Sequence, residues 1–427
     1  MLFRSLSRFL SRNPKWLFAI QEKWLGVGHD VLDLRGASWV IRRPEWLRKK
    51  SGSVKLLEPE LGEKSGDIEV AERCINAYRT MLDPSSHGAR PEGSIWGTLL
   101  GEDYKQLRTL IERGDTRSLA RHQAKIFRTS AVNGFAYGNT FDPWPHRWHY
   151  LPVQIELSVV QLAEAIGVLR AECHEQGHVA FWRSILSEEE LIERIENYFG
   201  FRVEHPRFGD PRGIMFGGRF LTRETCSHLY TADRVRRAIR REKISEPLRF
   251  VEIGGGYGGM CYWLCKVLGD QLENYVIVDL PEVGLVQAFF LASVFPDKLI
   301  LRGEAGQSSM PSIKLVAHFE LDEIGFRPNV LMNQDSMPEM PEAEVVRYLG
   351  WATENLDGVF ISFNQETLSP NNLAGEYDEV DRQDTAGHGA YQIWVPEVVR
   401  RFPRFQLASR DTSWDRRGYV EEIYVTL

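Results

Sequence analysis

The C-terminal part of the chain, from about Arg249 onward, alternates short β-branched runs with helical stretches. This alternation is typical of βαβ units and predicts a parallel sheet. The last two candidate strands are separated only by DTSWDRRGY, too short for a helical crossover, so we expect an antiparallel hairpin at the sheet edge. The seven predicted strands are RFVEIG, NYVIVDL, KLILRG, NVLMN, GVFISFN, FQLASR and VEEIYVTL.

The region before this sheet is predicted to be mostly helical, because its apolar residues recur at spacings of three and four. In one of these helices Ser187 and Glu190 form a capping pair, and Gly200 is suited to close the other end. The stretch 51–67 mixes Gly, Ser, Pro and charge and is interpreted as a linker. We therefore expect an N-terminal segment and linker (1–67), a helical domain (68–245) and a sheet domain (246–427).

The composition is that of a soluble globular protein, with 43% hydrophobic and 26% charged residues. The net charge of −7 gives no overall attraction to nucleic acid, so no nucleic-acid partner is predicted. The five cysteines are an odd number without the short-spaced pairs of structural zinc sites, which fits a reducing cytosol. Cys261 and Cys265 are interpreted as buried apolar residues on one helix face.

No run of about eighteen apolar residues occurs, so we expect no membrane span. The N-terminal stretch carries Arg4, Arg8, Arg12 and Lys15 among Leu, Phe and Trp. That pattern suits a helix on an acidic membrane surface, and a solvated or partner-packed helix is the alternative. The expected location is the cytoplasm, with the inner membrane surface left open.

The run FVEIGGGYGGMCYWLCKVLG predicts a strand, a glycine turn and a helix, whose first N–H groups can face a ligand closely. Gly254, Gly256 and Gly259 also satisfy the dinucleotide spacing, with Asp279 at the distance of a ribose-binding acid. Two features favour S-adenosylmethionine instead. Glu252 places an acid where it can meet the methionine ammonium group, and the C-terminal hairpin is unnecessary in a dinucleotide domain.

Successive motifs of this region, FVEIGGGYGGMCYWL, YVIVDLPEV, NVLMNQDSMPEM and FISFNQE, resemble those of the sugar O-methyltransferases of bacterial surface-glycan gene clusters. The helical stretch from Ile95 to Gly138 is also similar. The resemblance implies an α/β class I methyltransferase fold, with a Rossmann-like seven-stranded sheet at the C-terminus preceded by a mostly α-helical region. Asp-Leu-Pro after the second strand also resembles plant-type small-molecule O-methyltransferases. However, NQDSMPEM replaces the catalytic His-Asp pair of that group.

Methyl transfer to a hydroxyl needs in-line alignment and a group that assists deprotonation. The predicted catalytic residues are Asp335, His388 and, in reserve, Glu339. Asp335 could instead be a turn or N-cap acid, and His388, between glycines, could be a solvated loop residue. Asp335 and Glu366 could hold a divalent ion, but no metal is predicted.

Two further segments carry alternatives. HEQGH, from His174 to His178, matches a zinc-binding H-E-x-x-H helix, although Gly177 disfavours a helix interior and no clear third ligand follows. The aromatic stretch DPWPHRWHYLP could line an acceptor groove, with core packing as the alternative.

The sequence therefore predicts an S-adenosylmethionine-dependent O-methyltransferase that acts on a sugar or glycan hydroxyl. The alternatives are a non-sugar O-methyltransferase, a zinc protease and an NAD-dependent oxidoreductase. We expect residues 246–427 to bind the cofactor, and the helical domain to help form the acceptor site, with a homo-oligomer left open. The predicted cofactor-binding residues are Glu252, Gly254, Gly256, Tyr257, Gly258, Asp279, Leu280, Glu304 and Asn333.

Overall fold

The computed structural model describes residues 65–79, 96–132, 136, 151–171, 181–304, 311–366, 393–416 and 418–427. The described residues form two compact units. The smaller unit contains 151–171, 181–205 and 212–227, and the sheet unit contains 65–79, 96–132, 136, 206–211 and the described residues from 228 onward. The sheet unit thus also includes helices that lie before the predicted boundary at residue 246.

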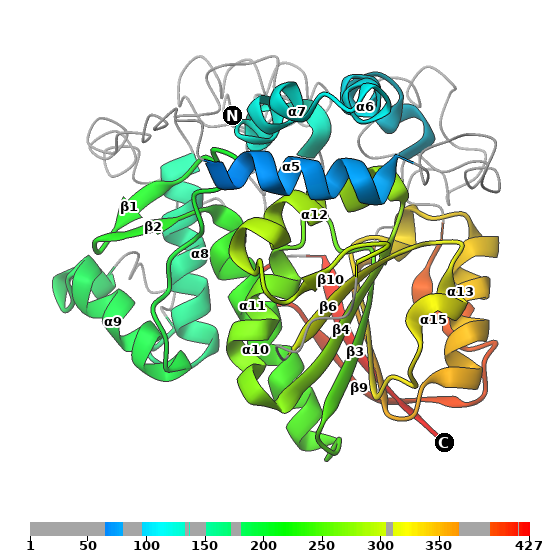
Figure 1. Ribbon diagram of the computed structural model, residues 1–427. Coiled ribbons are helices and arrows are strands. Elements are labelled where there is room, and N and C mark those ends of the chain that lie inside the picture. Colours follow the sequence, from blue (N-terminus) through cyan, green and yellow to red (C-terminus); the bar gives the residue numbers. More distant parts are fainter. Residues whose placement is uncertain are drawn as a thin grey trace, which may run out of the picture. The chain divides into compact units, whose positions relative to one another are not determined.

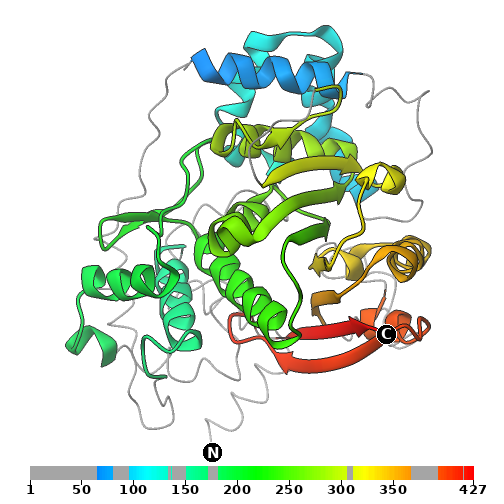
Figure 2. The same ribbon diagram turned by 60° about the horizontal axis from the view of Figure 1, so that its bottom comes forward.

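The sheet unit is built on eight strands in the order β5-β6-β4-β3-β7-β8-β10-β9. The first six in this order are parallel, whereas β10 runs antiparallel to both β8 and β9 (Figure 2). This order with its antiparallel end is the Rossmann-like class I methyltransferase arrangement, so the predicted fold and hairpin are confirmed. The strands are β3 (Leu248–Ile253), β4 (Leu272–Asp279), β5 (Leu299–Ile300), β6 (Ser312–Ala317), β7 (Val330–Gln334), β8 (Val359–Gln365), β9 (Phe405–Thr412) and β10 (Tyr419–Thr426).

The third segment of the predicted sheet is only partly confirmed, and the strand that follows it was not predicted. KLILRG contributes only the two-residue β5, and the unpredicted β6 pairs with β4 along its whole length. The β6 sequence SIKLVA is only weakly recognisable as a strand, because the polar residues Ser312 and Lys314 interrupt its apolar run. In the structure these two side chains are only partly buried. As a result, the residue that follows β6, His318, lies beside Asp279, and the peptide N–H of His318 donates to the Asp279 carbonyl at 2.8 Å.

Helices cover both faces of the sheet (Figure 1). On one face, apolar residues of the central strands, Val251 and Ile253 among them, form a buried cluster with α13 (Glu342–Asn355) and α15 (Val395–Val399). Side chains alternate between the faces of a strand, so Phe250 points the other way and stacks on Tyr275 with 4.7 Å between ring centroids. That second face is covered by α11 (Gly259–Leu268) and α12 (Pro281–Val294).

Three helices from the N-terminal half belong to the sheet unit: α5 (Ser65–Tyr78), α6 (Trp96–Arg113) and α7 (Thr116–Gln123). Helix α5 approaches α12 closely, because a Cβ atom at Gly284 would lie 2.6 Å from the Tyr78 hydroxyl oxygen. Arg108 of α6 forms an ion pair with the buried Glu282 of α12 at 2.8 Å. Two 3-10 turns, Ile126–Arg128 and Ser130–Val132, follow α7.

The smaller unit contains α8 (Leu151–Ala165), a 3-10 turn (Phe181–Ser184), α9 (Glu188–Phe199) and a hairpin of β1 (Ile214–Phe216) and β2 (Arg219–Leu221). The predicted capping box of α9 is confirmed, since Ser187 and Glu190 bond reciprocally and Gly200 adopts the left-handed conformation. Helix α10 (Arg223–Arg241) begins in this unit, and its residues from 228 onward belong to the sheet unit.

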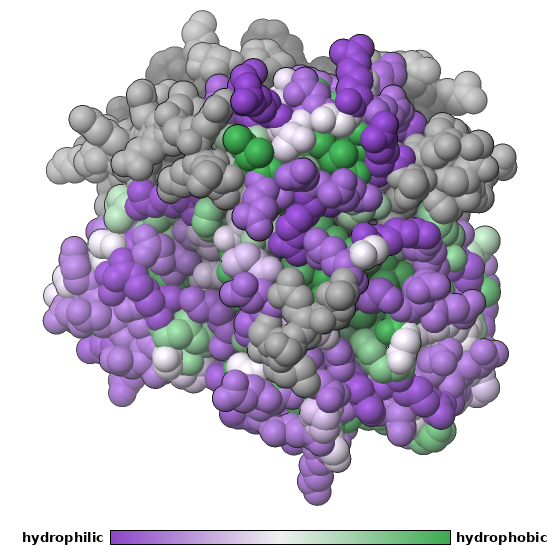
Figure 3. All heavy atoms as spheres, viewed as in Figure 1, coloured by the Kyte–Doolittle hydropathy of each residue, from purple (hydrophilic) through white to green (hydrophobic). Residues whose placement is uncertain are grey.

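Hydrophilic residues dominate the described part of the surface seen in Figure 3. Within the described residues, no helix combines the length and apolar character that a membrane crossing requires.

Candidate active site

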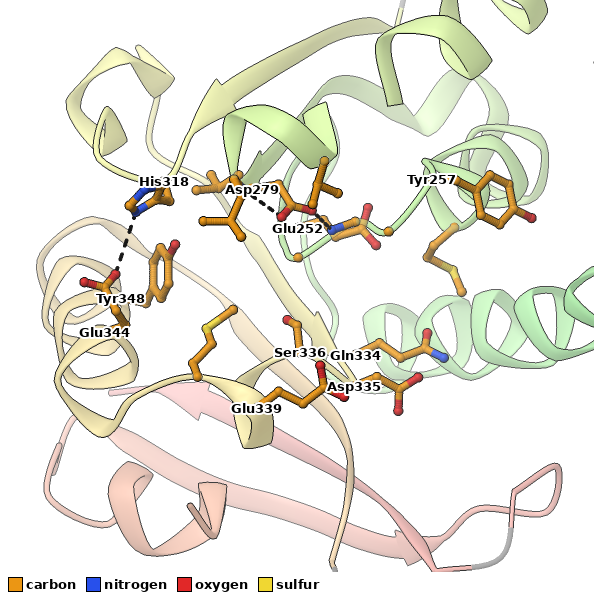
Figure 4. A pocket seen from close by; sticks show the side chains of 18 of the residues that line it. Glu252, Tyr257, Asp279, His318, Gln334, Asp335, Ser336, Glu339, Glu344 and Tyr348 are labelled. Atoms are coloured by element: carbon orange, nitrogen blue, oxygen red, sulfur yellow. Dashed lines mark hydrogen bonds and ion pairs between the residues drawn. The ribbon is translucent and has the colours of Figure 1, made fainter. Parts of the chain in front are cut away.

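A pocket opens at the carboxyl ends of the central parallel strands (Figure 4). In an open α/β sheet the ligand site is expected at this edge, where the connections diverge to opposite faces. Glu252 and Asp279 come from β3 and β4, whereas Gln334, Asp335 and Ser336 come from the end of β7. The polar and charged side chains of the lining are His228, Glu252, Tyr257, Asp279, His318, Gln334, Asp335, Ser336, Glu339, Glu344 and Tyr348.

The glycine turn after β3 forms one wall of this pocket. Gly254 has φ +75, and a Cβ atom added there would lie 2.1 Å from the Ser336 hydroxyl oxygen. A Cβ atom at Gly255 would lie 2.5 Å from Cγ2 of Ile277. The backbone of the turn therefore approaches Ser336 and Ile277 more closely than a residue with a side chain allows. Gly256 and Tyr257 also line the pocket, while Gly258, with φ +89, caps the start of α11 and does not line it.

Asp279 holds the glycine turn from the end of β4. Its carboxylate accepts hydrogen bonds from the N–H of Gly255 at 2.9 Å, the N–H of Leu280 at 2.8 Å and the amide of Gln287 at 2.7 Å. Burial raises the pKa of Asp279 to about 6, although these three donors favour the ionised form. The side chain is thus a preorganised acceptor at the pocket wall, and the predicted Leu280 lies next to it in the lining.

Glu252 is the most deeply buried acid of the pocket, with 2% of its surface exposed. The Tyr275 hydroxyl donates to its Oε2 at 2.8 Å. Burial, together with the nearby Asp279, raises the pKa of Glu252 to about 8. Close by, Oε1 of Gln287 is buried and accepts no hydrogen bond from a described residue. A cationic ligand group in the pocket would compensate the buried Glu252 carboxylate.

Asn333, predicted as a cofactor ligand, is fully buried and does not line the pocket. Its amide donates to the carbonyl of Ile253 at 2.8 Å and to the Ser336 hydroxyl at 2.5 Å. The Ser336 hydroxyl in turn donates to the Ile253 carbonyl at 3.1 Å. These bonds tie the end of β7 to the end of β3, so Asn333 shapes the wall against which Gly254 lies.

Asp335 and Glu339, two of the three predicted catalytic residues, both line the pocket. Asp335 adopts a left-handed backbone with φ 66, and its Oδ2 forms an ion pair with Arg416. Glu339 ends the 3-10 turn Met337–Glu339. Helix α13 takes Pro341 as its N-cap, so the alternative role of Asp335 as a helix cap does not apply.

Two other predicted residues lie away from the described pocket. Glu304 follows β5 and accepts two hydrogen bonds from Arg73, at 2.7 and 2.9 Å, so this carboxylate is engaged in an ion pair with α5. It does not line the pocket. His388 lies outside the described residues, as do the HEQGH motif and most of the aromatic stretch before α8.

The pocket is also lined by polar residues that the sequence did not indicate, notably His318, Glu344 and Tyr348. Burial lowers the pKa of His318, and its Nδ1 lies 4.0 Å from Glu344, as the dashed line in Figure 4 shows. Correct recognition of β6 as a strand would have identified His318, because it is the first residue after that strand. Glu344 and Tyr348 share a face of α13, and only the packing of that helix brings this face to the pocket.

Among the described residues, no group of three or more His, Cys, Asp or Glu side chains is placed to hold a metal ion. The two carboxylates considered for a divalent ion each have a cationic partner, Arg416 for Asp335 and Arg410 for Glu366. Cys261 and Cys265 are buried free thiols in α11, as predicted, and burial raises the pKa of Cys261.

No family model and no curated protein matches the chain. Among solved structures, it is similar to the magnesium protoporphyrin IX methyltransferase of Synechocystis PCC 6803 with bound SAH, at 16% identity over 48% of this chain and 85% of that chain, with a TM-score of 0.33. The pyocyanin biosynthetic protein PhzM is 15% identical over 92% of this chain and all of its own, with a TM-score of 0.34. TrmN of Thermus thermophilus is 14% identical over 56% and 67%, with a TM-score of 0.31. The assignment of the class I methyltransferase fold therefore rests on the strand order of the chain itself.

Proposed function

We propose that the chain is an S-adenosylmethionine-dependent O-methyltransferase whose acceptor is a sugar hydroxyl. The observation that carries the cofactor proposal is the set of ionisable residues in the pocket lining. This lining contains five acidic residues and, among the described residues, neither Lys nor Arg. Such a wall favours a ligand with cationic groups and disfavours a dinucleotide, whose pyrophosphate carries negative charge.

The residues present fit the groups of S-adenosylmethionine. Glu252 would take the ammonium group, because a buried carboxyl group with a raised pKa gains most from a cation that replaces its lost water. Asp279 would accept from ribose hydroxyls, as the loop-end acid does in sites of this topology. Gly254 lets the backbone of the turn lie directly against Ser336 in the pocket wall. When bound, the cofactor supplies an electrophilic methyl group on its sulfonium sulfur.

The chain's own residues would position the acceptor. Asp335 and Glu339 lie on the wall formed by the β7 loop, across from Glu252 and Asp279 in Figure 4. A carboxylate there can accept the hydrogen of an acceptor hydroxyl and orient its oxygen. Among the described residues, the lining offers neither Lys nor Arg to a phosphate or carboxylate on the acceptor, so we expect an uncharged acceptor group. The sugar assignment is supported by the resemblance of the strand-end motifs to sugar O-methyltransferases.

Calorimetry tests the cofactor proposal. The full-length chain should bind S-adenosylmethionine and S-adenosylhomocysteine, and should bind NAD weakly or not at all. Preferential binding of NAD would refute the assignment.

A mass-spectrometric screen tests the acceptor proposal. Purified protein is incubated with deuterium-labelled S-adenosylmethionine and a panel of glycans, glycosides and simple alcohols, and products are scanned for a labelled methyl gain. Transfer to neutral glycosides is expected. Transfer to non-sugar hydroxyls alone would replace the sugar assignment with the small-molecule alternative.

A further inference from the structure

Asp335 and Arg416 form an ion pair that joins the central sheet to its terminal hairpin. Arg416 lies in the turn between β9 and β10, and Asp335 lies at the end of β7, 81 residues earlier. The Arg416 guanidinium is itself held by the ring of Tyr419, 4.4 Å from the ring centroid. Burial alone would lower the pKa of Arg416, but the Asp335 carboxylate raises it above its ordinary value, so the guanidinium is always charged.

The backbone of Asp335 is held in an unfavourable conformation. Its φ of 66 lies in the left-handed region, which residues other than glycine avoid. The N–H of Asp335 donates to the carbonyl of Phe363 at 3.1 Å, and this bond holds the Asp335 backbone against the neighbouring strand β8. Backbone conformations of this kind persist where the surroundings enforce them, and they concentrate at functional sites.

The two carboxylate oxygens of Asp335 differ in their surroundings. Oδ2 receives Arg416, whereas Oδ1 is shielded from solvent and accepts no hydrogen bond from a described residue. Leaving a carboxylate oxygen without water or a donor costs free energy, so the Asp335 carboxylate is held in place by Arg416 rather than by solvent. Because Asp335 lines the pocket, a ligand bound there can reach this residue.

We propose that Arg416 is a positioning residue for the acceptor: it fixes the Asp335 carboxylate at the pocket wall, where that carboxylate accepts a hydrogen bond from an acceptor hydroxyl. This inference rests on the proposed function. It assigns to the terminal hairpin a direct part in orienting the acceptor. A purely structural role, in which Arg416 only ties the hairpin to β7, is the alternative that an experiment has to separate.

The test uses the full-length chain and four variants: Arg416→Gln, Arg416→Lys, Asp335→Asn and the double variant Arg416→Gln with Asp335→Asn. Arg410→Gln is the matched control, because Arg410 also forms ion pairs within the hairpin region, with Glu366 and Glu422, but does not line the pocket. Methyl transfer from deuterium-labelled S-adenosylmethionine is measured on methyl glycosides of glucose, mannose and rhamnose. Calorimetry with S-adenosylhomocysteine and thermal unfolding are run on every variant.

Arg416→Gln should lower kcat by about ten- to a hundredfold, the scale of a misplaced reacting group, while affinity for S-adenosylhomocysteine changes less than about twofold. Arg416→Lys should recover part of the rate. The double variant should be no slower than Asp335→Asn alone, because both substitutions remove the same interaction. Arg410→Gln should keep its turnover.

The inference would be overturned if the loss of kcat in the double variant equalled the product of the losses in the two single variants. Normal turnover in Arg416→Gln would overturn it as well. If Arg416→Gln does not fold, normal turnover in Asp335→Asn overturns it equally. A wild-type protein that binds the cofactor but methylates none of the glycosides would overturn this inference and leave the cofactor proposal standing. Failure of the wild type to bind S-adenosylmethionine would instead remove the proposed function itself.

Discussion

Tyr275 and Glu252 form a hydrogen bond between neighbouring buried strands, with 2.8 Å from the phenol oxygen to the carboxyl oxygen. Both side chains are almost completely inaccessible to solvent. Burial raises the pKa of Glu252 to about 8, so near neutral pH the ligand-free protein keeps this carboxyl group mainly protonated. The pocket therefore contains an acid that is expected to ionise when a cationic ligand group arrives.

The stability of the ligand-free protein should fall as pH rises through this range. Glu252 has a folded-state pKa of about 8 and an ordinary value of 4.5, so the folded state holds a proton that the unfolded state releases. The stabilisation is complete below about pH 4.5 and is lost as pH approaches 8. Asp279 acts in the same direction between its ordinary value of 3.8 and about 6. Urea unfolding at pH 6 and pH 8.5 measures the effect.

The matched variant for this measurement is Glu252→Gln, which keeps the shape of the side chain without its titration. Its stability should change less between pH 6 and pH 8.5 than that of the wild type. Equal slopes in the two proteins would mean that Glu252 is already ionised in the folded state.

Removing the charge of Asp279 should weaken cofactor binding. Asp279→Asn retains the size of the side chain but loses a charge-assisted acceptor, which is worth about 1 to 3 kcal/mol. Calorimetric titration with S-adenosylmethionine gives the difference, and Asp322→Asn, at an exposed acid, serves as the control. An Asp279→Asn protein with wild-type affinity would show that this carboxylate only braces the glycine turn.

Gly254→Ala should abolish cofactor binding, because the new Cβ atom would lie 2.1 Å from the Ser336 oxygen and displace the wall of the pocket. Gly303→Ala is the control for backbone strain alone, since Gly303 has φ +85 and no atom within 4 Å of an added Cβ. Thermal unfolding and calorimetry on both variants separate the two effects. Comparable binding losses at the two positions would contradict a local steric cause.

His388, which lies outside the described residues, remains a predicted catalytic base beside Asp335. His388→Ala should lower turnover by about a hundredfold to ten-thousandfold, the usual contribution of a general base, and leave cofactor affinity unchanged. Single-turnover kinetics with an acceptor glycoside, together with calorimetry, provide the two measurements. A variant that turns over normally would leave alignment by the pocket as the source of catalysis.

The fragment 246–427 should fail to fold, which differs from the expectation drawn from sequence that it would bind the cofactor alone. Glu421 of β10 is 2% exposed. Its buried carboxylate accepts a hydrogen bond from the Tyr230 hydroxyl and forms an ion pair with Arg234 at 2.6 Å, and the fragment lacks both of these partners. The fragment also lacks α5, which packs on α12. Circular dichroism of the fragment and of residues 60–427 would decide this. A cooperative unfolding transition in 246–427 would show that these contacts are dispensable.

The sequence by itself determined the class of the sheet, its terminal hairpin and the cofactor loop. These features are all local: the strand and helix periods, the glycine turn after β3, the acid Asp279 at the end of β4 and the short final connection. Each follows from the residues within one or two neighbouring elements, because backbone freedom, side-chain alternation and connection length act over short distances. The capping box of α9 was predictable for the same reason.

Only the tertiary structure decided which polar groups meet at the pocket and which are used elsewhere. Glu304 is bound by Arg73, 231 residues earlier, and Asp335 by Arg416 from the terminal hairpin, so their surroundings depend on contacts far apart in the chain. The weak strand β6 is recognisable through its pairing with β4 and brings His318 beside Asp279. Local sequence signals could not supply these contacts, because the packing of distant elements, rather than residue type, sets the partner and the burial of each charge.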